Sequence, residues 1–236
     1  MIKVIRGIGA RQMYLNSKTL SEFIRQSITS GESSVWIAQK EGRAKDGNDL
    51  TEQGLLKMFD MSGTKDFQQN FEELNIVPMA ISYEIEPCGI KKARELYIKA
   101  KTGSYTKKAN EDTNSIVSGI GRRKGHIHLS IGTPLTREEI AEAAALNGNE
   151  KYQHIRGILD ERIHGCYKLW KTNYMGYDLM NGTEEHLGSK YLPEDLKAFK
   201  VYTERELAKL ELGIDRNEVR KIFWSIYGNP VKNKKD

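Results

Sequence analysis

Residues 76–83 read Ile-Val-Pro-Met-Ala-Ile-Ser-Tyr, an uncharged and largely apolar run. Together with Glu84 and Ile85 they predict the strongest β-strand of the sequence. A run of this length is far too short to cross a bilayer as a helix. Working outward, β-rich runs stand at 34–39 and 125–131, and residues 3–6 read as the end of a further strand.

Apolar residues at helical spacing fill the stretches between these strands. The pair Thr19 and Glu22 has the capping-box pattern that opens a helix, and Gly31 closes it. The predicted helices are 19–30, 51–61, 66–74 and 90–102, and residues 110–114 are predicted as a loop. Because strands alternate with helices, we expect an α/β fold with a mixed, largely parallel sheet and flanking helices.

After Pro134 the strand patterns stop and helical patterns follow one another. The predicted helices are 136–146, 152–170, 193–212 and 215–227. This change divides the chain into an α/β core of residues 1–135 and a helical region of residues 136–236 packed on that core. The basic tail of residues 220–236 is expected to fray.

Composition sets wide limits on function. The 236 residues carry 37 basic and 32 acidic side chains, a net charge of +5, with 38% hydrophobic residues. This balance builds a core and is not typical of disorder. Two cysteines, Cys88 and Cys166, form no disulfide framework, and the amino terminus carries no apolar signal core, so a reducing cytoplasm is expected. The mild positive charge allows nucleic acid, anionic lipid or an acidic carrier protein as partners.

Several familiar motifs are incomplete in this sequence. Two glycine-rich stretches, 7–12 and 119–124, lack the last glycine of a dinucleotide fingerprint, and no Gly-Lys-Ser/Thr phosphate loop is present. His126 and His128 share one face of a predicted strand without a third ligand nearby, so we interpret them as strand residues and predict no metal. No Gly-x-Ser-x-Gly nucleophile motif occurs.

A cation-rich loop follows the predicted strand 34–39 and reads Glu41-Gly42-Arg43-Ala44-Lys45-Asp46-Gly47. The carboxyl edge of an α/β sheet is where such folds bind ligands. Arg43 offers a planar fork for a phosphate, Lys45 adds a point charge, and Glu41 is suited to orient Arg43 or a substrate hydroxyl. Taken by itself, the loop reads as a solvated surface loop.

Three segments occur in a recognisable order: Val4-Ile5-Arg6, then Glu41-Gly42-Arg43, then the Val77-Pro78 strand that ends in Tyr83-Glu84. In this order they resemble motifs two to four of the glycerolipid acyltransferase family, over roughly residues 1–135. The spacing differs from the family pattern because no residue separates Gly42 from Arg43.

The resemblance implies transfer of a fatty acyl group from an acyl-CoA or acyl carrier protein thioester. The acceptor would be the hydroxyl of glycerol-3-phosphate or lysophosphatidate, and no cofactor would be needed. It further implies that Arg6, Arg43 and Lys45 bind the acceptor phosphate, while Glu41 and Gly42 position the acceptor.

The family's first motif, His-x-x-x-x-Asp, is not found in this chain. None of the five histidines has an aspartate five positions later, and His154 misses Asp160 by one residue. In the family mechanism the histidine is the general base and the aspartate orients it. We therefore expect no transferase activity from these 236 residues. Two explanations stay open, an amino-terminal truncation, which we favour, and a short protein that binds phospholipid precursors without acylating them.

The expected location is the cytoplasm, with peripheral contact at the inner face of the cell membrane. The basic helix face at 91–101 would suit an acidic carrier protein or be a solvated surface. The helix at 217–227 would suit either a membrane interface or, as we prefer, core packing. Two other classes stay open. One is a nucleic-acid-binding module around 122–124, disfavoured because aromatic residues do not interleave with the basic ones. The other is an O-acyltransferase for an amino acid lipid.

Overall fold

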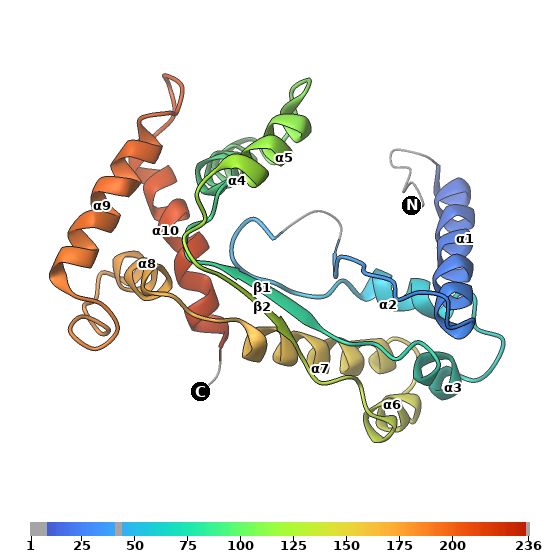
Figure 1. Cartoon of the computed structure of the whole chain (residues 1–236). Coiled ribbons are helices and arrows are strands. Elements are labelled where there is room, and N and C mark those ends of the chain that lie inside the picture. The colour runs from blue at the N-terminus through green and yellow to red at the C-terminus, as the bar shows by residue number, and fades with distance from the viewer. Residues whose placement is uncertain (1–8, 41–43, 235–236) are drawn as a thin grey trace. The chain divides into compact units, whose positions relative to one another are not determined.

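The computed structural model describes residues 9–40 and 44–234, and it is about 57% helical (Figure 1). In chain order the elements of these residues are α1 (Ala10–Thr29), α2 (Gln53–Asp60), α3 (Phe67–Glu72), β1 (Met79–Tyr83), α4 (Gly89–Thr102), α5 (Glu111–Gly121), β2 (Ile127–Ile131), α6 (Arg137–Ala144), α7 (Glu150–Cys166), α8 (Lys171–Asn181), α9 (Pro193–Leu207) and α10 (Arg216–Asn233). In the described part of the chain, no helix is long and apolar enough to cross a membrane.

The predicted α/β fold with a largely parallel sheet is wrong, because the described residues hold only two strands and these run antiparallel. The Glu84 amide donates to the His126 carbonyl (3.0 Å), and the Gly132 amide donates to the Pro78 carbonyl (2.8 Å) at the other end of the pair. This register places Ile81 opposite Leu129, and both side chains are exposed on the same face of the sheet.

The apolar run 34–39 is not a strand in the structure. Val35 and Ile37 are half-buried against a hydrophobic cluster, whereas Trp36 between them is 74% exposed. The alternating pattern is therefore satisfied by a loop that packs every second side chain, and no neighbouring strand is needed. The predicted strand end at 3–6 lies outside the described residues.

The chain folds into two compact units, each made of separate segments. The first comprises residues 1–43, 50–79 and 131–163, and the second comprises residues 44–49, 80–130 and 164–236. Each unit draws on both sides of residue 135, and the domain division expected at that residue stays a prediction.

The first unit packs α1, α2, α3, α6 and most of α7 around one hydrophobic cluster. Its fully buried members include Leu56, Phe71 and Ile155. Side-chain caps start two of these helices. Asp66 accepts from the Gln69 amide (2.9 Å) before α3, and Thr136 and Glu139 form a complete capping box before α6.

The second unit packs α4, α8, α9 and α10 around another cluster, which includes Ala93, Leu207 and Phe223. Its tightest contact is between α8 and α10, where Gly176 and Gly228 allow the two backbones to meet. A Cβ atom at Gly176 would lie 2.6 Å from the Tyr227 Cβ, and one at Gly228 would lie 2.9 Å from the Tyr177 backbone nitrogen. The helices reach this distance only because both positions lack a side chain.

Several predicted boundaries differ from the structure. The predicted helix 152–170 ends at Cys166, the predicted helix 193–212 ends at Leu207, and no helix was predicted at α8. Helix α1 begins at Ala10, so Thr19 lies inside it and not at its start. The predicted loop 110–114 is instead the beginning of α5. The tail expected to fray is helical through Asn233 and includes the buried Pro230. Apolar packing of the last turns explains this ordering, since most stability of helices in proteins comes from such packing.

Candidate phosphate-binding loop

The structure describes only part of the predicted acceptor site. Arg6, Glu41, Gly42 and Arg43 lie outside the described residues, and their roles stay predictions. Lys45 is described, together with the rest of the segment 44–49. This segment belongs to the second unit and packs on α10. We call residues 44–49 the anchored loop.

Gly47 lies directly against the backbone of α10. Its φ of +78° lies in the left-handed region, and a Cβ atom there would lie 2.4 Å from the Ile226 carbonyl oxygen. Pro230 has no N–H to donate to that oxygen, so α10 leaves it without its usual intrahelical partner. Pro230 and Gly47 together therefore allow the loop backbone to pack directly against α10 at Ile226. We call this contact the seat of the loop.

Asparagine side chains of α10 hold the rest of the anchored loop. The Asn229 amide donates to the Asp46 carbonyl (2.6 Å), and the Asn233 amide donates to the Asn48 side-chain oxygen (2.8 Å). Within the loop, the Asn48 backbone N–H donates to the Asp46 carboxylate (3.0 Å). The segment is thus fixed at successive residues, which is the condition for a preorganised binding loop.

Lys45 forms an ion pair with Glu95 of α4, and the two side chains are 31% and 16% exposed. The predicted point charge is therefore already balanced by a carboxylate. An incoming phosphate would have to share the ammonium group with Glu95 or replace it.

The basic face of α4 is also largely paired. Lys92 lies 3.0 Å from Glu86, Lys101 lies 2.8 Å from Glu218, and Arg94 bonds to Glu211 and to the Tyr105 hydroxyl. The hydrogen bond from Arg94 to Glu211 raises the pKa of the guanidinium. These pairs neutralise three of the five cations of this helix face, and contact with a carrier stays a prediction.

Two of the histidines pair with nearby carboxylates. His126 Nδ1 lies 2.8 Å from the Glu84 carboxylate, and its ring stacks on Trp170 at 5.4 Å between centroids. Burial alone would raise the pKa of Glu84, but hydrogen bonds from His126 lower it. His154 Nε2 lies 3.7 Å from the Glu142 carboxylate, and the Asp160 carboxylate instead accepts the Thr51 backbone N–H (2.6 Å).

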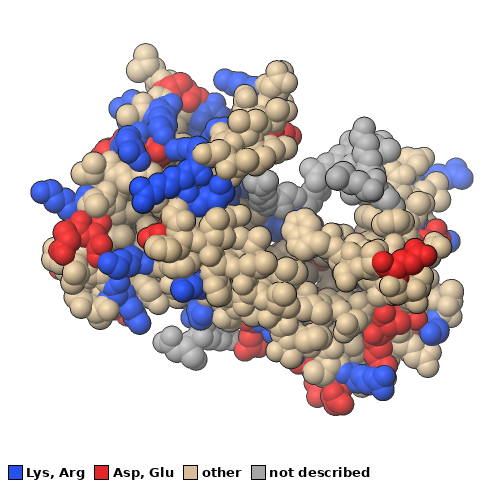
Figure 2. Space-filling view, viewed as in Figure 1, with Lys and Arg blue, Asp and Glu red and all other residues tan. Residues whose placement is uncertain are grey.

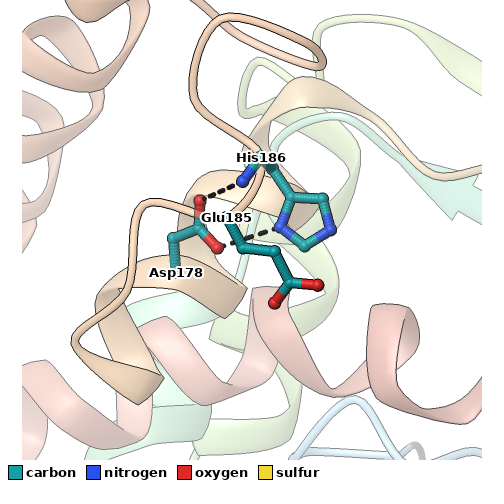
Figure 3. A group of neighbouring side chains, drawn as sticks. All are labelled: Asp178, Glu185 and His186. Carbon is teal, nitrogen blue, oxygen red and sulfur yellow. Dashed lines mark hydrogen bonds and ion pairs between the residues drawn. The ribbon is translucent and has the colours of Figure 1, made fainter.

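A third histidine–carboxylate pair, like the two above, was not predicted. Figure 3 shows Asp178, on α8, beside His186 in the following turn, with Nδ1 of the imidazole 2.9 Å from the carboxylate. Eight residues separate the two along the chain, and no sequence signal places them together. The turn between them reverses at Gly182, which has a positive φ.

The Asp178 carboxylate accepts hydrogen bonds from the segment that follows α8. It accepts the His186 amide (2.9 Å), the Tyr191 hydroxyl (2.7 Å) and the Thr183 hydroxyl (3.2 Å) in addition to the imidazole. Burial would raise its pKa, but the hydrogen bonds from His186 and Tyr191 lower it. Glu185 lies close enough to complete a three-ligand group. A metal would have to displace bonds that hold the turn, and we assign the cluster a structural role.

Comparison of the chain with family models, curated proteins and solved structures finds no match.

Proposed function

We propose that this chain binds a glycerol-3-phosphate-type acceptor as an acyltransferase-like protein of phospholipid biosynthesis. The order of the three motifs supports the acceptor, and the anchored loop is the structural observation that carries the proposal. The cationic segment Arg43-Ala44-Lys45 runs directly into a backbone held by α10. A loop that is already ordered loses less conformational entropy when it binds a ligand.

The chemistry of the loop suits a phosphate monoester. The Arg43 guanidinium can donate two parallel hydrogen bonds to phosphate oxygens, and Lys45, two positions later in the sequence, adds a compact charge. Glu95 of α4 holds the Lys45 ammonium group in an ion pair when no acceptor is bound. A dianionic phosphate competes with this single carboxylate for the ammonium group. The acyl donor in this proposal is an acyl-CoA or acyl carrier protein thioester.

Calorimetric titration of the 236-residue chain with glycerol-3-phosphate tests the proposal, because binding does not require a general base. We expect saturable binding, no heat with glycerol, and competition by inorganic phosphate. Arg43→Gln should weaken binding on the order of tenfold or more, the loss of a bidentate charged contact. Lys65→Gln is the matched control, since Lys65 pairs with a glutamate in the first unit and should not affect binding.

Absence of binding by the wild-type chain, or equal binding by Arg43→Gln, would contradict the proposal. Salt-dependent binding of RNA or DNA in place of glycerol-3-phosphate would favour the nucleic-acid class.

A further inference from the structure

Helix α5 belongs to the second unit and turns its polar side toward the rest of that unit. Lys91 of α4 donates to the Asn114 carbonyl (2.9 Å) and to the Ser118 hydroxyl (2.7 Å), and the Cys88 thiol lies 3.5 Å from the Ser115 carbonyl. At the start of the helix, the Tyr105 hydroxyl donates to Glu111 (2.7 Å). The face of α5 that meets the protein is therefore attached by hydrogen bonds.

The opposite side of α5 is apolar and open to solvent. Ile116, Val117 and Ile120 are 53%, 63% and 76% exposed, and no residue of the helix is buried. Their spacing of three and four residues places them together on one face. A surface helix of a globular protein normally points such a face into the core. Here the usual arrangement is inverted, which leaves a compact apolar surface without a partner among the described residues.

Basic residues border this apolar face. Residues 104–124 contain five basic and two acidic side chains, a net charge of +3. Lys108 before the helix and Arg123 after it are exposed, and the Lys124 ammonium caps the carbonyls of Ile120 and Arg122. Figure 2 shows uncharged side chains over α5 with Lys and Arg side chains gathered beside them.

The end of α5 is fixed by an ion pair between the partly exposed Arg122 and a buried glutamate. Arg122 donates both to the carboxylate of Glu206, which is buried in α9, and to the Pro87 carbonyl (2.8 Å). Arg122 thus forms its hydrogen bonds within the second unit, and the positive charge exposed beside α5 comes from neighbouring residues such as Arg123. The second unit carries 24 basic and 18 acidic residues, a net charge of +6, whereas the first unit has 13 and 14, a net charge of −1.

We propose that α5 is an interfacial helix that binds an anionic lipid bilayer. Ile116, Val117 and Ile120 would enter the boundary between headgroups and acyl chains, while Lys108 and Arg123 meet lipid phosphates. An exposed apolar stripe with cationic borders is the pattern of helices that lie in the membrane plane. A second copy of the chain fits less well, because the two basic borders would face each other. The inference does not depend on the proposed acceptor site.

Co-sedimentation of the full chain with vesicles tests this assignment. One set of vesicles contains phosphatidylcholine alone, and the other contains phosphatidylcholine with phosphatidylglycerol. We expect binding to the anionic set, weakened by salt. The double variant Ile116→Ser, Ile120→Ser should bind the anionic vesicles about tenfold or more weakly, because serine side chains lack the apolar surface that would be buried in the lipid. Arg123→Gln should weaken binding to the anionic vesicles alone.

Leu212→Ser is the matched control, because Leu212 is 96% exposed in the same unit and lies outside α5. This variant should bind like the wild type. A fluorescence measurement on Ile120→Trp, with the emission shifted to the blue by anionic vesicles, would locate the contact on α5.

Equal binding by the double-serine variant, or equal partition of the wild type to both vesicle sets, would overturn the proposal. Self-association in light scattering that the double-serine variant abolishes, without vesicle binding, would overturn it in favour of a second copy. Calorimetry with glycerol-3-phosphate reports separately on the acceptor site.

Discussion

Helices α10 and α5 of the second unit use their apolar residues in opposite ways. Helix α10 buries Val219, Phe223, Ile226 and Tyr227 in the core, whereas α5 directs its three large aliphatic residues toward solvent. Helix α10 packs on the rest of the second unit through its apolar face. Helix α5 is held to the same unit by hydrogen bonds and one ion pair. An amphipathic pattern therefore predicts that a helix has two faces, but it does not tell which face meets the protein.

The sequence pattern indicated residues 217–227 of α10, and not α5, as a candidate interfacial helix. The basic and aromatic segment 217–227 suited an interfacial helix, with core packing preferred, and the structure confirms core packing. The Trp224 indole there donates to the Thr203 hydroxyl (3.3 Å) of α9. The helix with the exposed face, α5, begins in a segment predicted as a loop. The following predictions test the difference between the two helices through stability.

Truncation of the α10 face should have the largest effect. Phe223 is fully buried and packs near Tyr202 and Tyr227. Phe223→Ala should lower the free energy of unfolding by about 3–5 kcal/mol, because it removes buried apolar surface and leaves a cavity. Urea denaturation followed by circular dichroism measures the change. A loss below about 1 kcal/mol would contradict the assignment of α10 to the core.

The ion pair at the end of α5 should rank second. Glu206→Gln leaves the Arg122 guanidinium, about one-third exposed, with a neutral partner, and should lower stability by about 2 kcal/mol. Glu204→Gln is the matched control in the same helix. Glu204 pairs with Arg220 at the surface, where such pairs contribute less than about 1 kcal/mol. Hydrogen exchange in α5 should rise only in the Glu206 variant.

The contribution of Glu206 should also depend on pH. Burial would raise the pKa of this carboxyl, but hydrogen bonds from Arg122 and Lys209 lower it. A carboxyl with a lower pKa in the folded state stabilises the fold above its unfolded pKa, about 4.3. That stabilisation is lost as the pH falls toward the folded pKa. The stability difference between wild type and Glu206→Gln should therefore shrink below about pH 4, and a constant difference would contradict the pairing.

The seat of the anchored loop on α10 should rank third. Gly47→Ala places a methyl group against the Ile226 carbonyl and should lower stability by about 1–3 kcal/mol. Gly103→Ala is a close control, because Gly103 has the same φ of +78° in the same unit with no atom within 4 Å of its Cβ position. The excess loss at Gly47, measured by urea denaturation, reports the contact with α10 alone. Equal losses at both sites would mean that the loop is not seated there.

Local signals in the sequence predicted much of the secondary structure. The helical patterns at 136–146 and 90–102 and the apolar run 76–85 each gave an element close to its observed place, whereas the Thr19 and Glu22 pair lies inside α1. Pairing between distant segments was not accessible in the same way. Nothing near residues 34–39 shows that this run packs as a loop, and nothing near Asp178 shows that it bonds to His186. Similarly, the seat for Gly47 depends on Pro230, 183 positions later.

The smallest effect is expected on the apolar face of α5. Ile120→Ser should change the free energy of unfolding by no more than about 0.5 kcal/mol, because the side chain is mostly exposed and contacts little protein. The same substitution in α10, Ile226→Ser, removes a buried side chain and should lower stability by about 3 kcal/mol or more. If Ile120→Ser instead destabilised the chain by more than about 1 kcal/mol, the aliphatic face of α5 would be packed against protein in solution. That result would remove both the contrast with α10 and the free surface that a bilayer needs.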